Sequence, residues 1–189
     1  MGSVYTCQVK NNLNIKSRDT AVVETASGEH MNQKSNNAVV AFDADNKGIE
    51  YIPQGLEKIF RNLKVIYIRN GSLKEIQQSD FKHYSNLIYL ELYQNDIAII
   101  EDGVFDFIPN IRVIWLPHNK ISHVGENVFS KLSKLTYLGL AENPCINEST
   151  MDLPGKGRII IKNLKQKCFD QNFSKLSKNL KNLEMKRNI

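Results

Sequence analysis

The sequence has no long apolar run, few cysteines and histidines, and a single tryptophan. None of its apolar stretches approaches the roughly 18 to 20 residues that a membrane-spanning helix needs. The first residues also lack the basic and apolar regions of a secretory signal peptide. Hydrophobic residues make up 41% of the 189 positions and charged residues 24%, which is ordinary for a globular domain.

Signatures of catalysis and of metal binding are missing as well. The three cysteines form no C-x-x-C pair, so the sequence predicts no zinc site. Among the four histidines, His118 and His123 lie on one predicted coil and diverge, and the other two lie in unrelated segments. There is no G-x-S-x-G, P-loop or dinucleotide fingerprint. Asp43 and Asp45, near Glu91, are a candidate carboxylate pair, but exposed carboxylates are usually solvated. We expect a protein that is not an enzyme and has no cofactor.

Positive charge is concentrated at the C-terminal end. Residues 156–189 contain ten Lys or Arg and two Asp or Glu, whereas residues 1–155 contain fifteen Lys or Arg and eighteen Asp or Glu. The net charge of +5 for the whole chain therefore comes from the C-terminal segment. A solvated helix explains such a tail, and attraction to phosphate or anionic lipid is the alternative.

An internal repeat of 24 residues dominates the middle of the chain. Its copies begin LKVIYIRNGSLKEI at Leu63, LIYLELYQNDIAII at Leu87, IRVIWLPHNKISHV at Ile111 and LTYLGLAENPC at Leu135, with a degenerate copy from Val39. The shared pattern, L-x-x-L-x-L-x-x-N-x-L-x-x-L followed by a Phe, resembles the leucine-rich repeat.

That resemblance implies an α/β solenoid, a right-handed superhelix in the form of a short horseshoe. We expect an N-terminal β cap over residues 1–38, repeats over 39–145 with starts near 39, 63, 87, 111 and 135, a C-terminal cap over 146–168, and a basic amphipathic helical tail over 169–189.

Each element of the repeat has a physical role. The leucines of each copy point inward from a short parallel strand, and Phe81, Phe105 and Phe129 fill the opposite side of the core. The buried amides of Asn95, Asn119 and Asn143 are expected to satisfy backbone groups of neighbouring coils. Gly71 and Lys47 replace this Asn in the first two copies, which suggests different backbone bonding near the N-terminal cap.

The segment after the last repeat is similar to the cysteine-bearing C-terminal cap of extracellular leucine-rich repeat proteins. The resemblance implies a disulfide between Cys145 and Cys168, with a short Ile-rich helix across the end of the core. Two buried free thiols in a cytosolic protein are the alternative.

The N-terminal segment is predicted to form a small antiparallel cap from three runs, VYTCQVKNNLNI, DTAVVETASG and NNAVVAFDA. It resembles the caps of secreted dipteran (mosquito and midge) leucine-rich repeat proteins, in which a signal peptide and another cysteine lie upstream. The resemblance implies that the partner of Cys7 precedes Met1. Residues 1–6 also match a myristoylation pattern, but Val4–Val9 are expected to lie in a sheet.

Stacking the coils in register places the outward-facing residues in columns about 4.8 Å apart. One column contains Asp43, Tyr67, Glu91, Trp115 and Gly139, and Gly139 is expected to leave a gap beside the exposed Trp115 ring. Tyr and Trp are the side chains that anchor interfaces, although aromatic residues also favour strands without any ligand. We predict a ligand-binding concave face formed by Trp115, Tyr89, Tyr93, Tyr137, Tyr67, Glu91 and Arg69.

The expected function is therefore non-enzymatic, extracellular recognition of a protein or microbial-surface ligand, with no nucleic acid partner and with a place in insect innate defence implied by the resemblance. Glycosylation candidates are Asn70, Asn147 and Asn172. The rival hypothesis is an assembly protein, because Phe173, Leu176, Leu180 and Leu183 form an apolar stripe at helical spacing in the tail. Residues 170–189 are thus expected to pack on the domain, to form a homo- or hetero-oligomer, or to bind an anionic surface.

Overall fold

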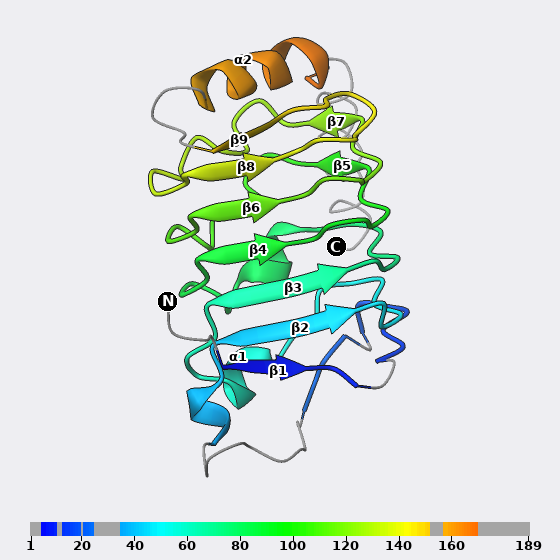
Figure 1. Cartoon of the computed structure of the whole chain (residues 1–189), viewed down its shortest axis with the longest axis vertical. Coiled ribbons are helices and arrows are strands. Elements are labelled where there is room, and N and C mark those ends of the chain that lie inside the picture. Colours follow the sequence, from blue (N-terminus) through cyan, green and yellow to red (C-terminus); the bar gives the residue numbers. More distant parts are fainter. Residues whose placement is uncertain (1–4, 11–12, 20, 25–34, 152–156, 170–189) are drawn as a thin grey trace, which may run out of the picture.

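A computed structural model describes residues 5–10, 13–19, 21–24, 35–151 and 157–169. These residues stack as successive coils, with one strand from each coil side by side in a single sheet (Figure 1). In order across the sheet, the strands are β1 (Thr6–Gln8), β2 (Ala41–Asp45), β3 (Val65–Arg69), β4 (Tyr89–Glu91), β6 (Val113–Trp115), β8 (Tyr137–Gly139) and β9 (Ser149–Met151).

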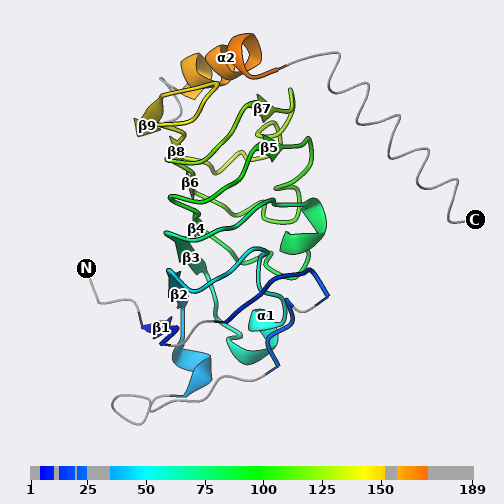
Figure 2. The same cartoon turned by 90° about the vertical axis from the view of Figure 1, so that its right-hand side faces the viewer.

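The register of the sheet follows the 24-residue repeat. Ala41 pairs with Val65, Val65 with Tyr89, Tyr89 with Val113, and Val113 with Tyr137, always in parallel. On the opposite side of the coils, β5 (Ile99–Ile100) and β7 (His123–Val124) form a second, two-stranded parallel sheet (Figure 2). The predicted parallel stacking of the coils is confirmed.

Short helices complete the coils. The 3-10 helices η2 (Asn36–Ala38) and η3 (Gln78–Phe81) and the α-helix α1 (Leu56–Ile59) connect strands, and α2 (Gly157–Lys167) lies across the end of the stack beyond β9.

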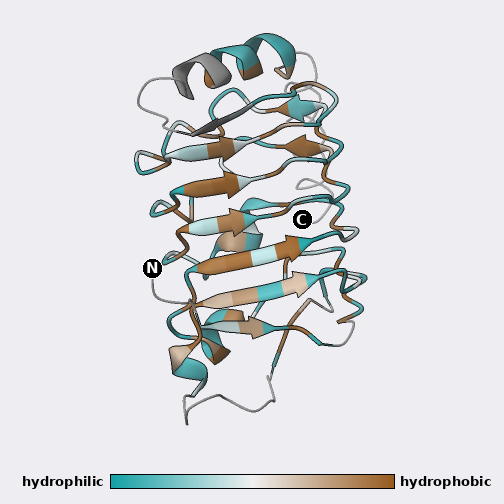
Figure 3. Cartoon of the chain, viewed as in Figure 1, coloured by the Kyte–Doolittle hydropathy of each residue, from teal (hydrophilic) through white to brown (hydrophobic). Residues whose placement is uncertain are grey.

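The core lies between the two sheets. Ile66, Leu90, Ile114 and Leu138, which are register partners on successive strands, are fully buried. Farther from the large sheet, the Phe105 ring contacts Phe81 and Phe129, with centroids 5.8 and 6.0 Å apart. Hydrophobic residues concentrate in the central strands, while the connecting turns are largely hydrophilic (Figure 3). A coil cannot bury its apolar edge alone, so stacking supplies the core.

Buried asparagines link the coils as predicted. The Asn119 side chain accepts a hydrogen bond from Ile97 N at 3.2 Å and donates to the carbonyl oxygens of Leu92 and Leu116 at 2.8 and 3.1 Å. Asn95 and Asn143 make the equivalent bonds one coil earlier and one coil later. These amides satisfy backbone groups that the turns leave unpaired inside the protein.

In the copy that begins at Leu63, Gly71 replaces this asparagine, and the structure shows why a side chain is disfavoured there. A Cβ atom on Gly71 would lie 2.8 Å from the Oδ1 atom of Asn95. That oxygen is fixed because it accepts the Leu73 N–H, so a side chain at position 71 would displace a bonded group.

The predicted antiparallel N-terminal cap is wrong. Strand β1 pairs in parallel with β2, with Cys7 opposite Phe42, and extends the main sheet as one more coil. Among the described residues of the second expected run, 19 and 21–24, Val22 forms an isolated parallel bridge with Gln54, and the third run contains η2 and then β2. Alternation identifies a strand but not its direction, and a parallel neighbour matches the pairing of the sheet that β1 joins.

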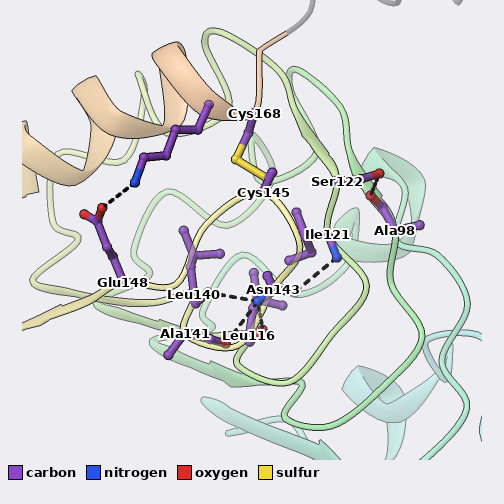
Figure 4. The surroundings of a disulfide bond; sticks show 11 residues. Ala98, Leu116, Ile121, Ser122, Leu140, Ala141, Asn143, Cys145, Glu148 and Cys168 are labelled. Atoms are coloured by element: carbon purple, nitrogen blue, oxygen red, sulfur yellow. Dashed lines mark hydrogen bonds and ion pairs between the residues drawn. A yellow bond between two sulfur atoms is a disulfide. The ribbon is translucent and has the colours of Figure 1, made fainter.

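At the other end, the predicted C-terminal closure is confirmed. Cys145 and Cys168 form a disulfide, with Cα atoms 5.3 Å apart (Figure 4). The Glu148 carboxylate accepts hydrogen bonds from Asn163 on α2, and Leu164 of the same helix is buried. The sequence did not predict β9, which pairs antiparallel with β8 and covers its edge.

Candidate functional site

The outward face of strands β2, β3, β4, β6 and β8 brings together the residues predicted to bind a ligand. We call this surface the concave face, after the corresponding surface of curved solenoids. Asp43 pairs with Tyr67, Tyr67 with Glu91, Glu91 with Trp115, and Trp115 with Gly139, which is the predicted central column. Because the pairing is parallel and unbroken, these side chains emerge one strand apart.

Trp115 does not stand beside an open gap, contrary to the sequence-based expectation. A Cβ atom on Gly139 would lie 2.1 Å from Cε3 and 2.5 Å from Cζ3 of Trp115, so the indole ring itself occupies the space above the glycine. The ring also stacks on Tyr137, with centroids 5.1 Å apart and planes 24° apart. Trp115 is therefore partly buried and held in place before any ligand binds.

The N-terminal half of the face contains a charged network. The Arg69 Nη2 atom donates to both carboxylate oxygens of Asp43, at 2.7 and 2.9 Å, and Arg69 Nη1 lies 3.9 Å from Glu91 Oε1. The Arg69 guanidinium also lies over the Tyr67 ring, 5.2 Å from its centroid. Burial lowers the pKa of Arg69, but the hydrogen bond and charge of Asp43 outweigh it, so the net pKa is raised.

Tyr89 connects this network to the aromatic residues. Its hydroxyl donates to Glu91 Oε2 at 3.1 Å, and its ring tilts against Tyr67 with centroids 5.4 Å apart. Burial, together with the Glu91 charge and hydrogen bond, raises the pKa of Tyr89 well above its ordinary value. The shift therefore extends to more alkaline pH the range over which the phenol stays protonated and donates to Glu91.

Tyr93 lies two residues beyond Glu91, where the chain turns away from the sheet. Its ring makes an edge contact with His118 of the next coil, with centroids 5.2 Å apart. His118 belongs to a series with φ between 48° and 55° that recurs every 24 residues: Asn46, Asn70, Gln94, His118 and Glu142. The left-handed turn thus repeats after β2, β3, β4, β6 and β8, at the same edge of the concave face.

The roles of three residues on this surface differ from the prediction. Asp43 was placed in the central column but not among the ligand-binding residues, and its ion pair with Arg69 lies on a diagonal between neighbouring strands. Gly139 was expected to leave space rather than to seat a ring, and His118 was set aside with the other histidines. The opposite charges of Asp43 and Arg69, one strand and two residues apart, were a signal that could have revealed their pair.

The other predicted sites have separate locations. Asn70 and Asn147 are exposed; the first donates to Asp45 Oδ1 at 2.7 Å and the second accepts from Glu142 N at 2.8 Å. Asn172, the myristoylation pattern at Gly2 and the tail over 170–189 lie outside the described residues. Within the described ranges, no cluster of three metal-ligating side chains is present and no helix is long and apolar enough to cross a membrane.

Comparison with known proteins identifies the fold. The family model described as leucine rich repeat matches residues 61–121 and, overlapping them, 99–144. The fold is a leucine-rich repeat solenoid. No sequence among curated proteins gives a significant match.

Two solved structures share the leucine-rich repeat fold. A chain of the Toll–Spatzle complex, a molecular hub in Drosophila development and innate immunity, is 18% identical with a TM-score of 0.54, over 57% of this chain and 14% of that one. A chain of the TLR13–ssRNA13 complex is 24% identical with a TM-score of 0.51, over 57% of this chain and 15% of that one. The present chain thus matches about one seventh of each neighbour's length.

Proposed function

We propose that this leucine-rich repeat chain is a non-catalytic recognition module whose concave face binds a protein or microbial-surface ligand. The observation that carries the proposal is the set of aromatic side chains on that face: Tyr67, Tyr89, Tyr93, Trp115 and Tyr137. The inward positions of the same strands already supply the core, so the burial of the core does not require these rings. Tyr and Trp offer large contact areas at low entropic cost.

The geometry supports preorganised binding. Trp115 is fixed by Gly139 and Tyr137, and Arg69 is fixed by Asp43 and Tyr67. Side chains already ordered in the free protein lose less conformational entropy when a ligand binds.

An extracellular location is part of the proposal. The Cys145–Cys168 disulfide is typical of proteins that fold in an oxidising compartment, and the sequons at Asn70 and Asn147 are exposed. Both solved neighbours are complexes with a ligand, one of them tied to innate immunity. A role in insect innate defence follows as the biological setting we propose.

The ligand-binding hypothesis is tested by a pull-down from insect haemolymph. The bait is the wild-type chain, a Trp115→Ala, Tyr93→Ala double variant, or a Phe107→Ala control. Phe107 is an aromatic side chain, 40% exposed, in the loop between β5 and β6, away from the concave face. We expect a partner that wild type and the control capture and that the double variant loses. A partner retained by the double variant, with all baits equally folded by circular dichroism, would contradict the proposal.

The extracellular location is tested separately. The protein is made in insect cells from the complete gene, and its intact mass is measured under non-reducing conditions. We expect the Cys145–Cys168 bridge and a glycan on Asn147. A myristoyl group on Gly2 would place the protein inside the cell instead.

A further inference from the structure

The concave face changes chemical character between β4 and β6. The charged network around Arg69 lies on the strands before this boundary. Beyond it, the outward positions of β6 and β8 are all uncharged: Val113, Trp115, Tyr137 and Gly139. The three side chains among them are partly exposed, so this half of the face offers apolar surface to a ligand.

These three side chains form one continuous surface, which we call the apolar patch. Val113 is the register partner of Tyr137, and Trp115 is that of Gly139. The indole joins the two strands, because it lies above Gly139 and stacks on Tyr137 with centroids 5.1 Å apart. The only side-chain polar groups of the patch are the indole N–H and the Tyr137 hydroxyl. An apolar side chain therefore fits the patch better than a sugar ring, whose several hydroxyls would lose water without gaining partners.

A basic edge borders the concave face where the chain enters the strands, at the tails of the arrows in Figure 1. The entering turns are residues 60–64, 84–88, 108–112 and 132–136, and they contain no Asp or Glu. Their cationic residues are all exposed: Arg61, Lys64, Arg112 and Lys134. Within the described part of the chain, none of these four takes part in an ion pair. Their charge is therefore available to an anionic group.

Arg112 joins the basic edge to the apolar patch. It directly precedes Val113, and its carbonyl oxygen accepts hydrogen bonds from Thr136 N and Tyr137 N at 2.8 and 3.0 Å. The turn that enters β6 is thus bonded to the start of β8, at the margin of the patch. An unpaired cation beside a neutral surface favours a partner with a carboxylate at that position.

We propose that the apolar patch and Arg112 form a subsite for a protein segment that carries an apolar side chain close to an acidic one. The apolar side chain packs on Val113, Trp115 and Tyr137, and the carboxylate pairs with Arg112. This inference rests on the proposed function and narrows it to protein partners of this chemistry.

The test uses a library of random peptides displayed on phage and selected on the immobilised full chain. We expect the enriched peptides to share an acidic residue near an aromatic or aliphatic one. A fluorescein-labelled synthetic copy of an enriched peptide is then titrated with the chain, and its fluorescence anisotropy gives the affinity. A consensus rich in Lys and Arg, or no enrichment at all, would overturn the proposal.

Two substitutions in the chain and one in the peptide locate the contact. Arg112→Gln is expected to weaken the peptide about tenfold, whereas Lys82→Gln, at an exposed position after η3, should leave its affinity unchanged. Val113→Asp, which places a carboxylate in the apolar patch, should abolish binding. Changing the acidic residue of the peptide to its amide should weaken binding to wild type and have no further effect on Arg112→Gln. Independent, additive effects of the two charge removals would contradict the pairing.

The same measurement separates this inference from the proposed function. A peptide that the Trp115→Ala, Tyr93→Ala double variant loses, but that Arg112→Gln and Val113→Asp retain, would overturn the subsite while the concave face remains the binding surface. A peptide that all of these variants retain would contradict both. Binding of heparin that Arg112→Gln weakens, with no peptide enriched, would assign the basic edge to an anionic polysaccharide and overturn the inference.

Discussion

At the scale of single residues, the solenoid depends on polar groups that are buried but fully bonded. Asn119 joins two consecutive coils, because its amide bonds to Ile97 and Leu92 of the preceding coil and to Leu116 of its own. A buried polar group that loses its partner retains the full cost of leaving water. The leucines therefore supply the apolar surface that is buried in the core. The asparagines bond the polar backbone groups of the turns that are buried with it.

The first prediction concerns this amide. Asn119→Ala leaves the Ile97 N–H and the Leu92 carbonyl without this partner, while the Leu116 carbonyl keeps its hydrogen bond from Asn143. We therefore expect the free energy of unfolding to fall by about 2 kcal/mol or more. Lys120→Ala, next in sequence, breaks only an exposed ion pair with Asp96 and should change it by less than about 0.5 kcal/mol. Urea unfolding of both variants provides the measurement. An equal change in the free energy of unfolding in both variants would show that the buried asparagines do not stabilise the turns.

A second prediction concerns the ionisation of Tyr89. Its pKa is raised in the folded protein by burial and by Glu91, so between its ordinary value of about 10 and the higher folded value only the unfolded chain is ionised. This group therefore lowers stability as the pH rises above about 10 and has no effect below that pH. Glu91→Gln removes the charge while burial remains, so we expect the pKa of Tyr89 to decrease but to stay raised.

NMR of selectively labelled tyrosine measures this titration directly. Asp96→Asn, which removes a carboxylate from a turn rather than from the concave face, is the matched control and should leave Tyr89 unchanged. A Tyr89 that titrates identically in wild type and Glu91→Gln would contradict the contact.

At the scale of elements, α2 closes the C-terminal end of the core. It is attached by the disulfide, by the buried Leu164, and by the backbone bond from Val124 N to Cys168 O. A solenoid without such a cap exposes the apolar surface of its last coil.

The third prediction follows from that attachment. Cys168→Ala removes the bridge from a segment of 23 residues and is expected to lower the free energy of unfolding by roughly 3 kcal/mol. In this variant the backbone amide hydrogens of α2 should exchange with solvent before those of the repeats. Cys7→Ala is the matched control, because Cys7 makes no disulfide within the described part of the chain and is only partly buried. Thermal unfolding under non-reducing conditions compares the two variants. An equal loss of stability in Cys168→Ala and Cys7→Ala would argue against the cap as a stabilising element.

The same elements show what the sequence could and could not predict. The 24-residue period determined the register, because each copy supplies one strand and the inward leucines leave no freedom to slip. The columns of outward residues followed directly. The direction of β1 did not follow, since alternation is the same in parallel and antiparallel pairs. The packing of the Trp115 ring over Gly139 was also not predicted, because spacing gives the position of a side chain but not its rotamer.

At the scale of the whole molecule, stability should vary along the stack. Each coil contacts mainly its neighbours, so the central coils are supported on both sides and the terminal ones on one side. Leu90 and Ile114 are fully buried in the middle, whereas the residues of β1 are only partly buried or exposed.

Hydrogen exchange is the measurement for this fourth prediction. We expect the slowest exchange in β4 and β6 and the fastest in β1, with intermediate rates in β8 beneath the disulfide-bearing cap. Uniform protection from β1 to β9 would indicate a single cooperative unit rather than a stack of coupled coils.

Site-specific photocrosslinking in haemolymph shows directly whether a ligand contacts the concave face. The crosslinker p-benzoylphenylalanine replaces Tyr93 in one protein and Phe107 in a second, each as the full chain and with residues 170–189 deleted. We predict a specific adduct from position 93, independent of the tail, and none from position 107. Adducts only from position 107, or adducts that require residues 170–189, would place ligand binding elsewhere on the molecule.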